Sequence, residues 1–162
     1  MQSIGTKRNY ACTKSSGDLI MHWDDDAWYA PDWVSLQAKI LNKSNVDICG
    51  LSEFYFHSAA LHKSWMYSYP LQGKAWVGGA TRGYTRAFWQ NNPFKNMQIG
   101  EDNEFVWNTG TRVAIHNHIN GFVSMVHSGN SSPKNTENTS WNRVGNDIIA
   151  NMMGADYAAY RR

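Results

Sequence analysis

The sequence predicts an α/β fold in which a mixed sheet is flanked by helices. Apolar residues recur at helical spacing in some segments and alternate in others, which indicates both kinds of element. The 162 residues, 42% hydrophobic and 14% aromatic, are enough to build a packed core. No internal repeat and no break in composition divides the chain, so we expect residues 1–162 to form a single domain.

The beginning of the chain predicts a helix, a short strand and a second helix. Residues 7–16 fit a helix that ends at Gly17, and residues 19–23 then indicate a short buried strand. Pro31 suits the first turn of the next helix, which we expect to end at Asn42. Apolar residues recur at helical spacing within it: Trp33, Leu36, Ile40 and Leu41.

The middle of the chain predicts a hairpin followed by a brief helix. Residues 47–56 and 63–69 indicate two strands around a turn at 57–62, and the second strand alternates between aromatic and smaller side chains. Thr85 can cap a helix that continues through Trp89.

The end of the chain predicts one more helix and strand pair, a loop and a terminal helix. A helix of about two turns starts at Asp102, and strands follow at 113–115 and 122–126. Residues 128–140 are mostly Ser, Asn, Thr, Gly and Pro, which is typical of a flexible loop. A terminal helix fits residues 141–153.

Charge and composition limit the classes of partner. A net charge of +2 is too small to argue for nucleic acid or for an anionic membrane surface. No apolar stretch approaches the roughly 20 residues of a membrane-spanning helix, and the N-terminus lacks the apolar core of a signal peptide. Cys12 and Cys49 lack metal-ligand spacing and are interpreted as buried thiols, which suits a cytoplasmic location. Peripheral attachment to a membrane stays open.

Two acidic sites mark the candidate functional residues. Asp24, Asp25 and Asp26 directly follow the predicted strand, where the chain should reach the surface. Carboxylates packed together repel one another, so a divalent cation is their natural partner. The alternative is a solvated acidic turn. Against it stands a second acidic pair, Glu101 and Asp102, which opens the next helical pattern.

Taken in order, these motifs resemble the inverting family 2 glycosyltransferases of the GT-A fold, from about residue 5 to about residue 110. The residues that carry the resemblance are Lys7-Arg8-Asn9, Gly17-Asp18-Leu19-Ile20, His22 to Pro31, Gly78-Gly79 followed by Arg86, Pro93-Phe94 and Gly100-Glu101-Asp102. The resemblance implies transfer of a sugar, with inversion, from a nucleotide-sugar donor to an acceptor hydroxyl. It also implies a nucleotide-diphospho-sugar transferase fold.

The position of the triplet differs from the family pattern. In that family the triplet follows a long nucleotide-binding half, whereas here it begins at position 24. The resemblance therefore implies a truncated GT-A-like fold that consists of the metal-binding and acceptor half. We expect little or no transfer by this chain alone. We also expect a homo-oligomer, formed through the side of the sheet that the other half would cover.

The resemblance implies specific residues on the donor side. It places a Mn²⁺ or Mg²⁺ ion on Asp26, with Asp24 serving the metal or the donor ribose. Asp25 would support the donor site, and simple solvation is its alternative. Arg8 is similar to the family arginine near the nucleotide, although a surface ion pair explains it equally well. His127 follows a predicted strand, where related enzymes place a histidine on the metal or the diphosphate.

The resemblance also implies a base and an acceptor side. Asp102, preceded by Glu101, would take the proton of the acceptor hydroxyl, and a helix cap is the alternative. Gly78 and Gly79 would lie beside the acceptor, a saccharide or a lipid-linked group, unless they form a plain turn.

Arg86 and Trp89 would line the acceptor pocket, because sugars stack on aromatic rings and accept hydrogen bonds from planar donors. For Trp89, core packing is the alternative.

Two rival functions remain from the sequence. A non-catalytic carbohydrate-binding or interaction module would keep the shape of the half fold without turnover. A two-metal phosphoesterase also uses clustered carboxylates, but no further cluster supplies its bridging ligands. His116 and His118 are interpreted as exposed strand histidines rather than metal ligands.

Overall fold

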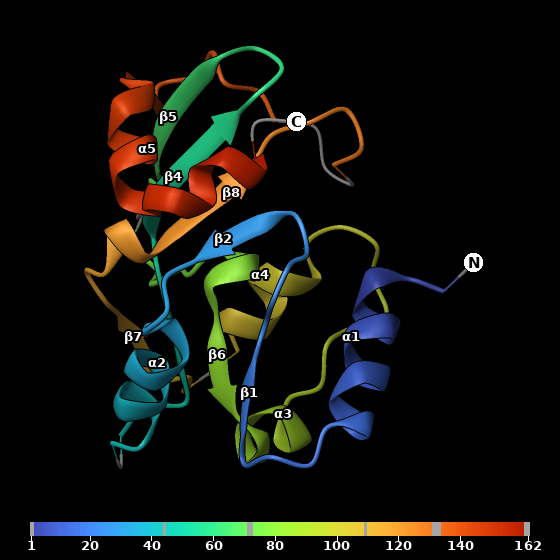
Figure 1. Cartoon of the computed structure of the whole chain (residues 1–162). Helices are drawn as coiled ribbons and strands as arrows, with labels where there is room; N and C mark the ends of the chain where they lie inside the picture. Colours follow the sequence, from blue (N-terminus) through green and yellow to red (C-terminus); the bar gives the residue numbers. More distant parts are fainter. Residues whose placement is uncertain (1, 44, 71–72, 109, 131–133, 161–162) are drawn as a thin grey trace.

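The computed structural model describes residues 2–43, 45–70, 73–108, 110–130 and 134–160. They form an α/β fold, as the sequence predicts, but with two mixed sheets instead of one (Figure 1). Helices flank both sheets.

The first sheet has four short strands in the order β1-β6-β3-β7. β6 runs antiparallel to β1 and β3, while β3 and β7 are parallel. The strands are β1 (Leu19–Met21), β6 (Gly83–Thr85), β3 (Ile48–Gly50) and β7 (Val113–Ile115). The helices in this part of the chain are α1 (Ile4–Lys14), α2 (Trp33–Leu41), α3 (Arg86–Asn91) and α4 (Glu101–Val106).

The second sheet has five strands in the order β2-β8-β4-β5-β9. Only β4 and β8 are parallel within it. The strands are β2 (Ala27–Tyr29), β8 (Phe122–Met125), β4 (Glu53–Ser58), β5 (Lys63–Ser68) and β9 (Trp141–Val144). The last helix, α5 (Asn146–Met153), continues into a 3₁₀ segment, Gly154–Tyr160.

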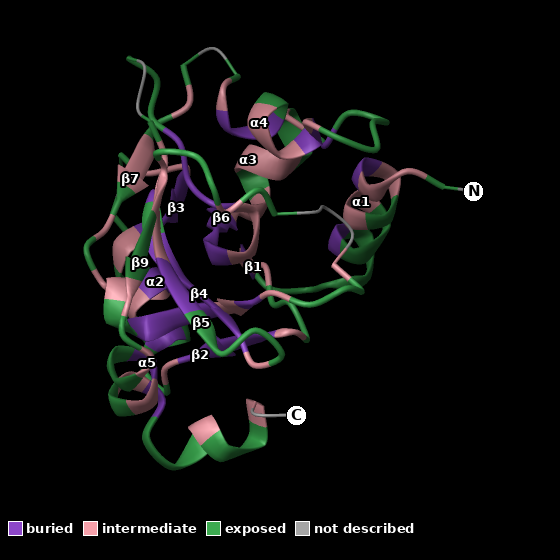
Figure 2. Cartoon of the chain, turned by 90° about the horizontal axis from the view of Figure 1, so that it is seen from above, coloured by how far each residue is buried: buried purple, intermediate pink, exposed green. Residues whose placement is uncertain are grey.

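Buried side chains form three clusters that follow the sheets. Figure 2 shows the buried residues concentrated in the strands. An aromatic cluster around Trp33, Phe54 and Phe122 packs on one face of the second sheet. A cluster under α5 includes Ile149 and covers the other face. The third cluster joins α1, α4 and the first sheet: Cys12, Ile20, Ile48, Val77, Tyr84, Phe94, Phe105 and Val106.

The predicted strand at 47–56 is wrong, because the chain changes sheets within it. The N–H of Leu51 donates to Thr81 Oγ1 at 3.0 Å, and its carbonyl accepts from Gly78 N–H at 2.8 Å. The carbonyl of Ser52 accepts from Tyr69 N–H at 2.9 Å. These bonds take the place of strand pairing, so β3 and β4 separate. They also hold residues 77–81, called the glycine segment below, beside the point where the chain passes from one sheet to the other.

The predicted helix at 141–153 is only half right. Residues 141–144 form β9, which pairs with β5, and the helix starts at Asn146 beyond Gly145. The predicted strand at 19–23 ends at Met21. The turn of the hairpin is shorter than expected, since β4 extends to Ser58.

The other predicted elements are confirmed with small shifts in their ends. The first helix begins at Ile4, the second ends at Leu41, and the side chain of Thr85 caps α3 by accepting from Phe88 N–H. Of the predicted loop at 128–140, residues 131–133 lie outside the described residues, and the described remainder consists of turns and irregular backbone.

Both cysteines are free and buried, as the sequence predicts. Burial raises the pKa of the Cys49 thiol to about 12. In the described part of the chain, every helix is too short or too polar to cross a bilayer.

Candidate active site

The aspartate triplet lies in the turn that leads from β1 of one sheet to β2 of the other. The N–H of Asp24 donates to Tyr29 Oη at 2.9 Å, and the carbonyl of Asp26 accepts from Met125 N–H at 3.1 Å. Tyr29 is buried in β2, and its hydroxyl in turn donates to the Ala80 carbonyl at 3.1 Å. The backbone of the triplet is therefore fixed to β8 and to the glycine segment.

Asp26 and His127 meet because β2 and β8 are paired. His127 Nε2 lies 3.0 Å from Asp26 Oδ2, and Asn130 Nδ2 donates to the same oxygen at 3.0 Å. The N–H of Gly129 donates to His127 Nδ1, so in the neutral ring Nε2 carries the proton and donates to the carboxylate. The structure thus brings together two of the predicted metal ligands.

Asp24 sits where like charges converge. Partial burial raises the pKa of its carboxyl above the usual value, and the charges of Asp26 and Asp25 raise it further. The positive charges of Arg8 and Lys134 act in the opposite direction. The triplet therefore faces basic side chains that lie far from it in the sequence.

Arg8 and Glu101 form an ion pair between α1 and the first residue of α4. Their closest atoms, Arg8 Nη1 and Glu101 Oε1, are 2.5 Å apart, and only 6% of the Glu101 side chain is exposed. The Arg8 guanidinium also lies 5.5 Å from the centre of the Phe94 ring. The Glu101 carboxylate is thus buried in an ion pair with Arg8, whereas the Asp102 side chain is partly exposed.

The side chains of Asp102 and Arg8 both lie close to the backbone of Gly79. A Cβ atom on Gly79 would lie 3.4 Å from Asp102 Oδ2 and 3.5 Å from Arg8 Nη2. The second carboxylate oxygen of Asp102 accepts from Asn103 N–H at 2.9 Å. Gly79 therefore leaves space against the carboxylate that a larger side chain would occupy.

Gly78 has a different role from Gly79. A Cβ atom there would lie 2.6 Å from the ring of Phe54, so the residue is a glycine because the aromatic core approaches its backbone. Gly78 is buried, whereas Gly79 is partly exposed.

Arg82 is a fully buried charge behind Asp102. Its guanidinium donates to the carbonyls of Val77 and Asp102 at 3.0 and 3.2 Å, and Nη2 lies 3.9 Å from Asp102 Oδ2. Burial lowers its pKa to about 10, against the opposing effect of the Asp102 charge. Arg82 thus holds the end of the glycine segment against the start of α4.

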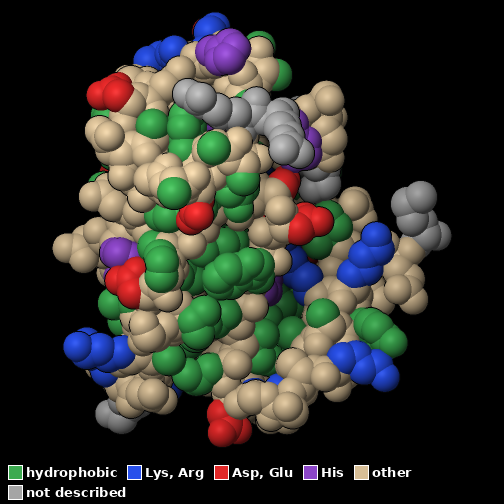
Figure 3. Space-filling model, in the orientation of Figure 1, with side chains coloured by type: hydrophobic (Ala, Val, Ile, Leu, Met, Phe, Trp, Pro, Cys, Tyr) green, Lys and Arg blue, Asp and Glu red, His purple; other side chains and the backbone are tan. Residues whose placement is uncertain are grey.

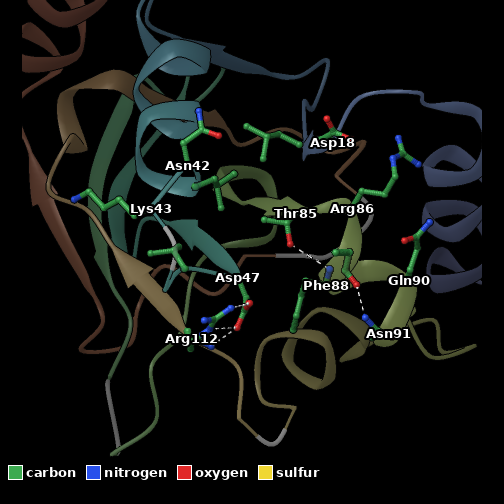
Figure 4. Close-up of a pocket in the computed structure, with 14 residues that line it drawn as sticks. Asp18, Asn42, Lys43, Asp47, Thr85, Arg86, Phe88, Gln90, Asn91 and Arg112 are labelled. Atoms are coloured by element: carbon green, nitrogen blue, oxygen red, sulfur yellow. Dashed lines mark hydrogen bonds and ion pairs between the residues drawn. The ribbon is translucent and has the colours of Figure 1, made fainter.

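Arg86 and Trp89 lie at the opposite end of the first sheet. Arg86 donates to the carbonyls of Gly17 and Cys12, and so closes the end of α1. It also borders an open cavity of about 720 Å³ with both polar and apolar lining, and Figure 4 shows its side chain directed toward α1. Trp89 packs against the core cluster and donates to Asn9 Oδ1 at 2.9 Å. The structure does not bring either residue to the triplet.

A smaller cavity of about 260 Å³ opens beside the triplet. Asp25, Asp26 and His127 contribute to its wall, together with the buried ring of His57 and with Tyr160. This is where the structure places Asp25.

Sequence reasoning missed Arg82, His22, Tyr29 and Asn130. One signal in the sequence could have indicated Arg82: it lies closer to Gly78 and Gly79 than Arg86 does. The others act through contacts that only the fold creates.

The donor atoms near Asp26 suit a divalent cation in kind. Carboxylate oxygens and an imidazole nitrogen are common ligands of Mn²⁺. The described residues contain no group of three or more His, Cys, Asp or Glu side chains arranged to hold a metal ion. Asp26, with Asp24 adjacent in the turn, could therefore supply only part of the ligands that a metal ion needs, and His127 could add a nitrogen only with its proton on Nδ1 instead of Nε2.

The arrangement of two mixed sheets, flanking helices and an acidic turn at the strand ends is that of a GT-A-like fold. Residues 2–120 match the family described as Glycosyl transferase family 2, and the chain belongs to this family. The matched range contains Arg8, the triplet, both glycines and Asp102, while His127 lies beyond it. No match was found among curated proteins.

Proposed function

We propose that this protein is a metal-dependent, inverting glycosyltransferase that moves a sugar from a nucleotide-sugar donor to an acceptor hydroxyl. One observation carries the proposal. The carboxylate of Asp102 and the guanidinium of Arg8 meet at Gly79, and the charge of the same arginine acts on Asp24 in the triplet. The residues proposed as base, as phosphate-binding cation and as metal ligands thus lie in one region of a family 2 fold, which supports the proposal.

Asp26 would hold the Mn²⁺ or Mg²⁺ ion, with Asp24 beside it, and His127 would join through Nε2 once its proton has moved to Nδ1. When bound, the ion supplies Lewis-acid stabilisation of the charge that develops on the departing diphosphate. Asn130 keeps the Asp26 carboxylate in place through its bond to Oδ2. Arg8 adds a positive charge near Asp24, and Glu101 fixes the direction of its guanidinium.

Asp102 is the proposed base. The acceptor hydroxyl gives its proton to Asp102 Oδ2 as its oxygen bonds to the anomeric carbon, and the bond from that carbon to the diphosphate breaks. The other oxygen, Oδ1, is held by Asn103 N–H, which orients the carboxylate. Gly79 leaves the approach to Oδ2 open.

A second candidate is a carbohydrate-binding module without turnover. It is favoured by Trp23, which precedes the triplet, is 57% exposed and stacks on Tyr29 with ring centres 4.0 Å apart. A rigid exposed aromatic face is a suitable surface for a sugar ring.

The first measurement tests the metal site. Mn²⁺ at ten times its dissociation constant should stabilise the protein by about 1.4 kcal/mol, which raises Tm by about 3–6 °C. Asp26→Ala should abolish this shift. Asp18→Ala, at the other end of β1, is the matched control and should keep it. Equal shifts in wild type and Asp26→Ala would show that the metal binds elsewhere.

The second measurement separates transfer from binding alone. Calorimetry and turnover assays would use UDP-glucose, UDP-galactose and GDP-mannose with Mn²⁺. In a transferase, Asp102→Asn lowers kcat by about 10²- to 10⁴-fold and leaves donor binding intact. Because we expect little or no transfer by this chain alone, sugar binding without turnover would favour the binding module only if that binding does not depend on Mn²⁺ and Asp26. Tight nucleotide-sugar binding that Asp26→Ala leaves unchanged would contradict both proposals for this site.

A further inference from the structure

A chain of hydrogen bonds runs behind the glycine segment, from α1 to the backbone of Gly79. Cys12 Sγ lies 3.3 Å from Tyr84 Oη, and Tyr84 Oη lies 3.1 Å from His22 Nε2. On its other side, His22 Nδ1 lies 2.9 Å from the Gly79 carbonyl oxygen. His22 comes just before the triplet, so this chain joins the strand that leads to the triplet with the segment that faces Asp102.

The donor and acceptor in each hydrogen bond can be assigned by starting from the Gly79 carbonyl, at the end of the chain. A carbonyl oxygen only accepts, so His22 Nδ1 must carry a proton. In the neutral form of the ring, Nδ1 is then the donor and Nε2 the acceptor. Nε2 therefore has a free lone pair.

The protons of Tyr84 and Cys12 can be assigned in the same way. Burial raises the pKa of both Tyr84 and Cys12, so each keeps its proton. Tyr84 accordingly donates to His22 Nε2, and its oxygen accepts from the Cys12 thiol. A single arrangement of protons satisfies all the groups, with the Nδ1–H tautomer of His22 at its centre.

The ring of His22 is also held mechanically. It meets Tyr84 edge to face, with ring centres 5.4 Å apart, and lies 5.8 Å from Phe94. Glycine has unusual backbone freedom, so a glycine peptide beside a catalytic group needs an external restraint to keep one orientation. The imidazole N–H supplies that restraint at Gly79.

We propose that His22 is a positioning residue: its Nδ1–H fixes the Gly79 carbonyl and so keeps the glycine segment in the conformation that leaves Asp102 Oδ2 open to the acceptor. The catalytic part of this inference rests on the proposed function. The tautomer and the restraint on Gly79 do not.

Two variants distinguish the two ring nitrogens. The side-chain amide of His22→Asn places an N–H near the position of Nδ1, and can keep the bond to Gly79. His22→Gln places its amide near the position of Nε2, and can satisfy Tyr84 but not Gly79. A residue that only fills space should tolerate Gln at least as well as Asn, because Gln is closer to His in size.

The deciding experiment is NMR on the full chain, labelled with ¹⁵N histidine and with ¹³C at the glycine carbonyls and aspartate carboxylates. We expect long-range ¹H–¹⁵N correlations to show His22 as the Nδ1–H tautomer. The Gly79 carbonyl and Asp102 carboxylate resonances should stay in place in His22→Asn and shift in His22→Gln. An Nε2–H tautomer, or equal shifts in both variants, would overturn the proposal.

Turnover provides a second reading with the same three nucleotide sugars. We expect His22→Gln to lower kcat about 10- to 100-fold with little change in KM for the donor, and His22→Asn to restore most of the loss. Equal kcat in the two variants would overturn the positioning role. A failure of the proposed function looks different, because it removes the dependence on Mn²⁺ and Asp26 while the NMR result stands.

Discussion

At the scale of single residues, Asp24 is where function and stability oppose each other. Its carboxyl is crowded by protein and by the charges of Asp25 and Asp26, which together raise its pKa. The ionised form is therefore less favourable in the folded chain than in the unfolded chain. A site built to hold a cation has this property when it is measured without one.

Asp24→Asn should stabilise the metal-free protein at pH 7. Because the folded pKa is raised, the wild-type carboxyl contributes most below its unfolded pKa of about 3.9, and this contribution is lost as pH rises through the folded value. Asparagine does not ionise, so the variant gains stability at neutral pH and none at the acid end; because Asp24 is exposed and water screens its charge, the gain is below about 1 kcal/mol. Urea unfolding at pH 7 and pH 3.5, with Asp18→Asn as control, measures the difference. A less stable variant at pH 7 would contradict this interpretation.

The acidic residues were predictable from sequence because of their context. Carboxylates beside an apolar run are costly to bury, so the pattern itself points to a compensating partner. Arg82 and His22 were not predictable, because their roles depend on carbonyls presented by other segments. Arg86 is the opposite case, a residue to which the sequence assigned a role that the fold does not support. Its place in the order of motifs suggested the acceptor pocket, while the fold directs its guanidinium to the end of α1.

At the scale of elements, β6 is the strand that organises the first sheet. It has three residues, yet it pairs with β1 on one side and β3 on the other. Its first residue, Gly83, is buried against α2, where the Gln37 side chain crosses to donate to the Thr81 carbonyl. This close approach connects α2 to the glycine segment.

Gly83→Ala should destabilise the protein by about 1–3 kcal/mol, because the new methyl group would overpack this contact. Its Cβ would lie 2.5 Å from Gln37 Oε1 and 3.2 Å from Leu41 Cδ1. Thermal or urea unfolding measures the change. The exposed Gly17, whose Cβ would meet its nearest atom at 3.3 Å, is the control, and Gly17→Ala should cost less. Equal costs would mean that the α2 contact relaxes freely.

Elements were predictable when their periodic pattern was long enough. The helix at α2 and the strand β5 show several repeats of their period, and the sequence located both; it located the hairpin partner β4 only in part, because it merged β4 with β3. The three-residue strands β2 and β6 show no alternation and were missed, whereas the equally short β1 was located from its apolar residues. The β9 segment was assigned to the last helix because its apolar ends also fit a helical spacing; pairing with β5 decides between the two.

At the scale of the whole molecule, the first sheet ends in β1 on one side. Figure 3 shows hydrophobic side chains gathered in the middle of the face on which β1 and β2 lie in Figure 1. Trp23 and Val34, 57% and 49% exposed, are among the large apolar residues at the surface. An edge strand and exposed apolar side chains both favour association.

We therefore expect the chain to self-associate through β1. Sedimentation at tens of micromolar should give a mass above that of the monomer. Met21→Lys places a charge on the edge strand and should shift the mass toward the monomer. Lys39→Glu, an exposed charge change on α2, is the control and should leave the mass unchanged. A monomeric wild type across this range would refute the prediction.

The hydroxyl of Tyr29 is hydrogen-bonded both to the proposed donor side of the site, at the triplet, and to the proposed acceptor side, at the glycine segment. It accepts from the backbone of Asp24 and donates to the carbonyl of Ala80, which follows Gly79. Bonds that share one hydroxyl polarise each other, so strengthening or loosening one alters the other. In the proposed enzyme, an acceptor that shifted the glycine segment would therefore change the affinity of the triplet for the donor. By thermodynamic linkage the donor would then change the affinity for the acceptor by the same factor. Binding of the two substrates would thus be coupled through the hydroxyl of Tyr29.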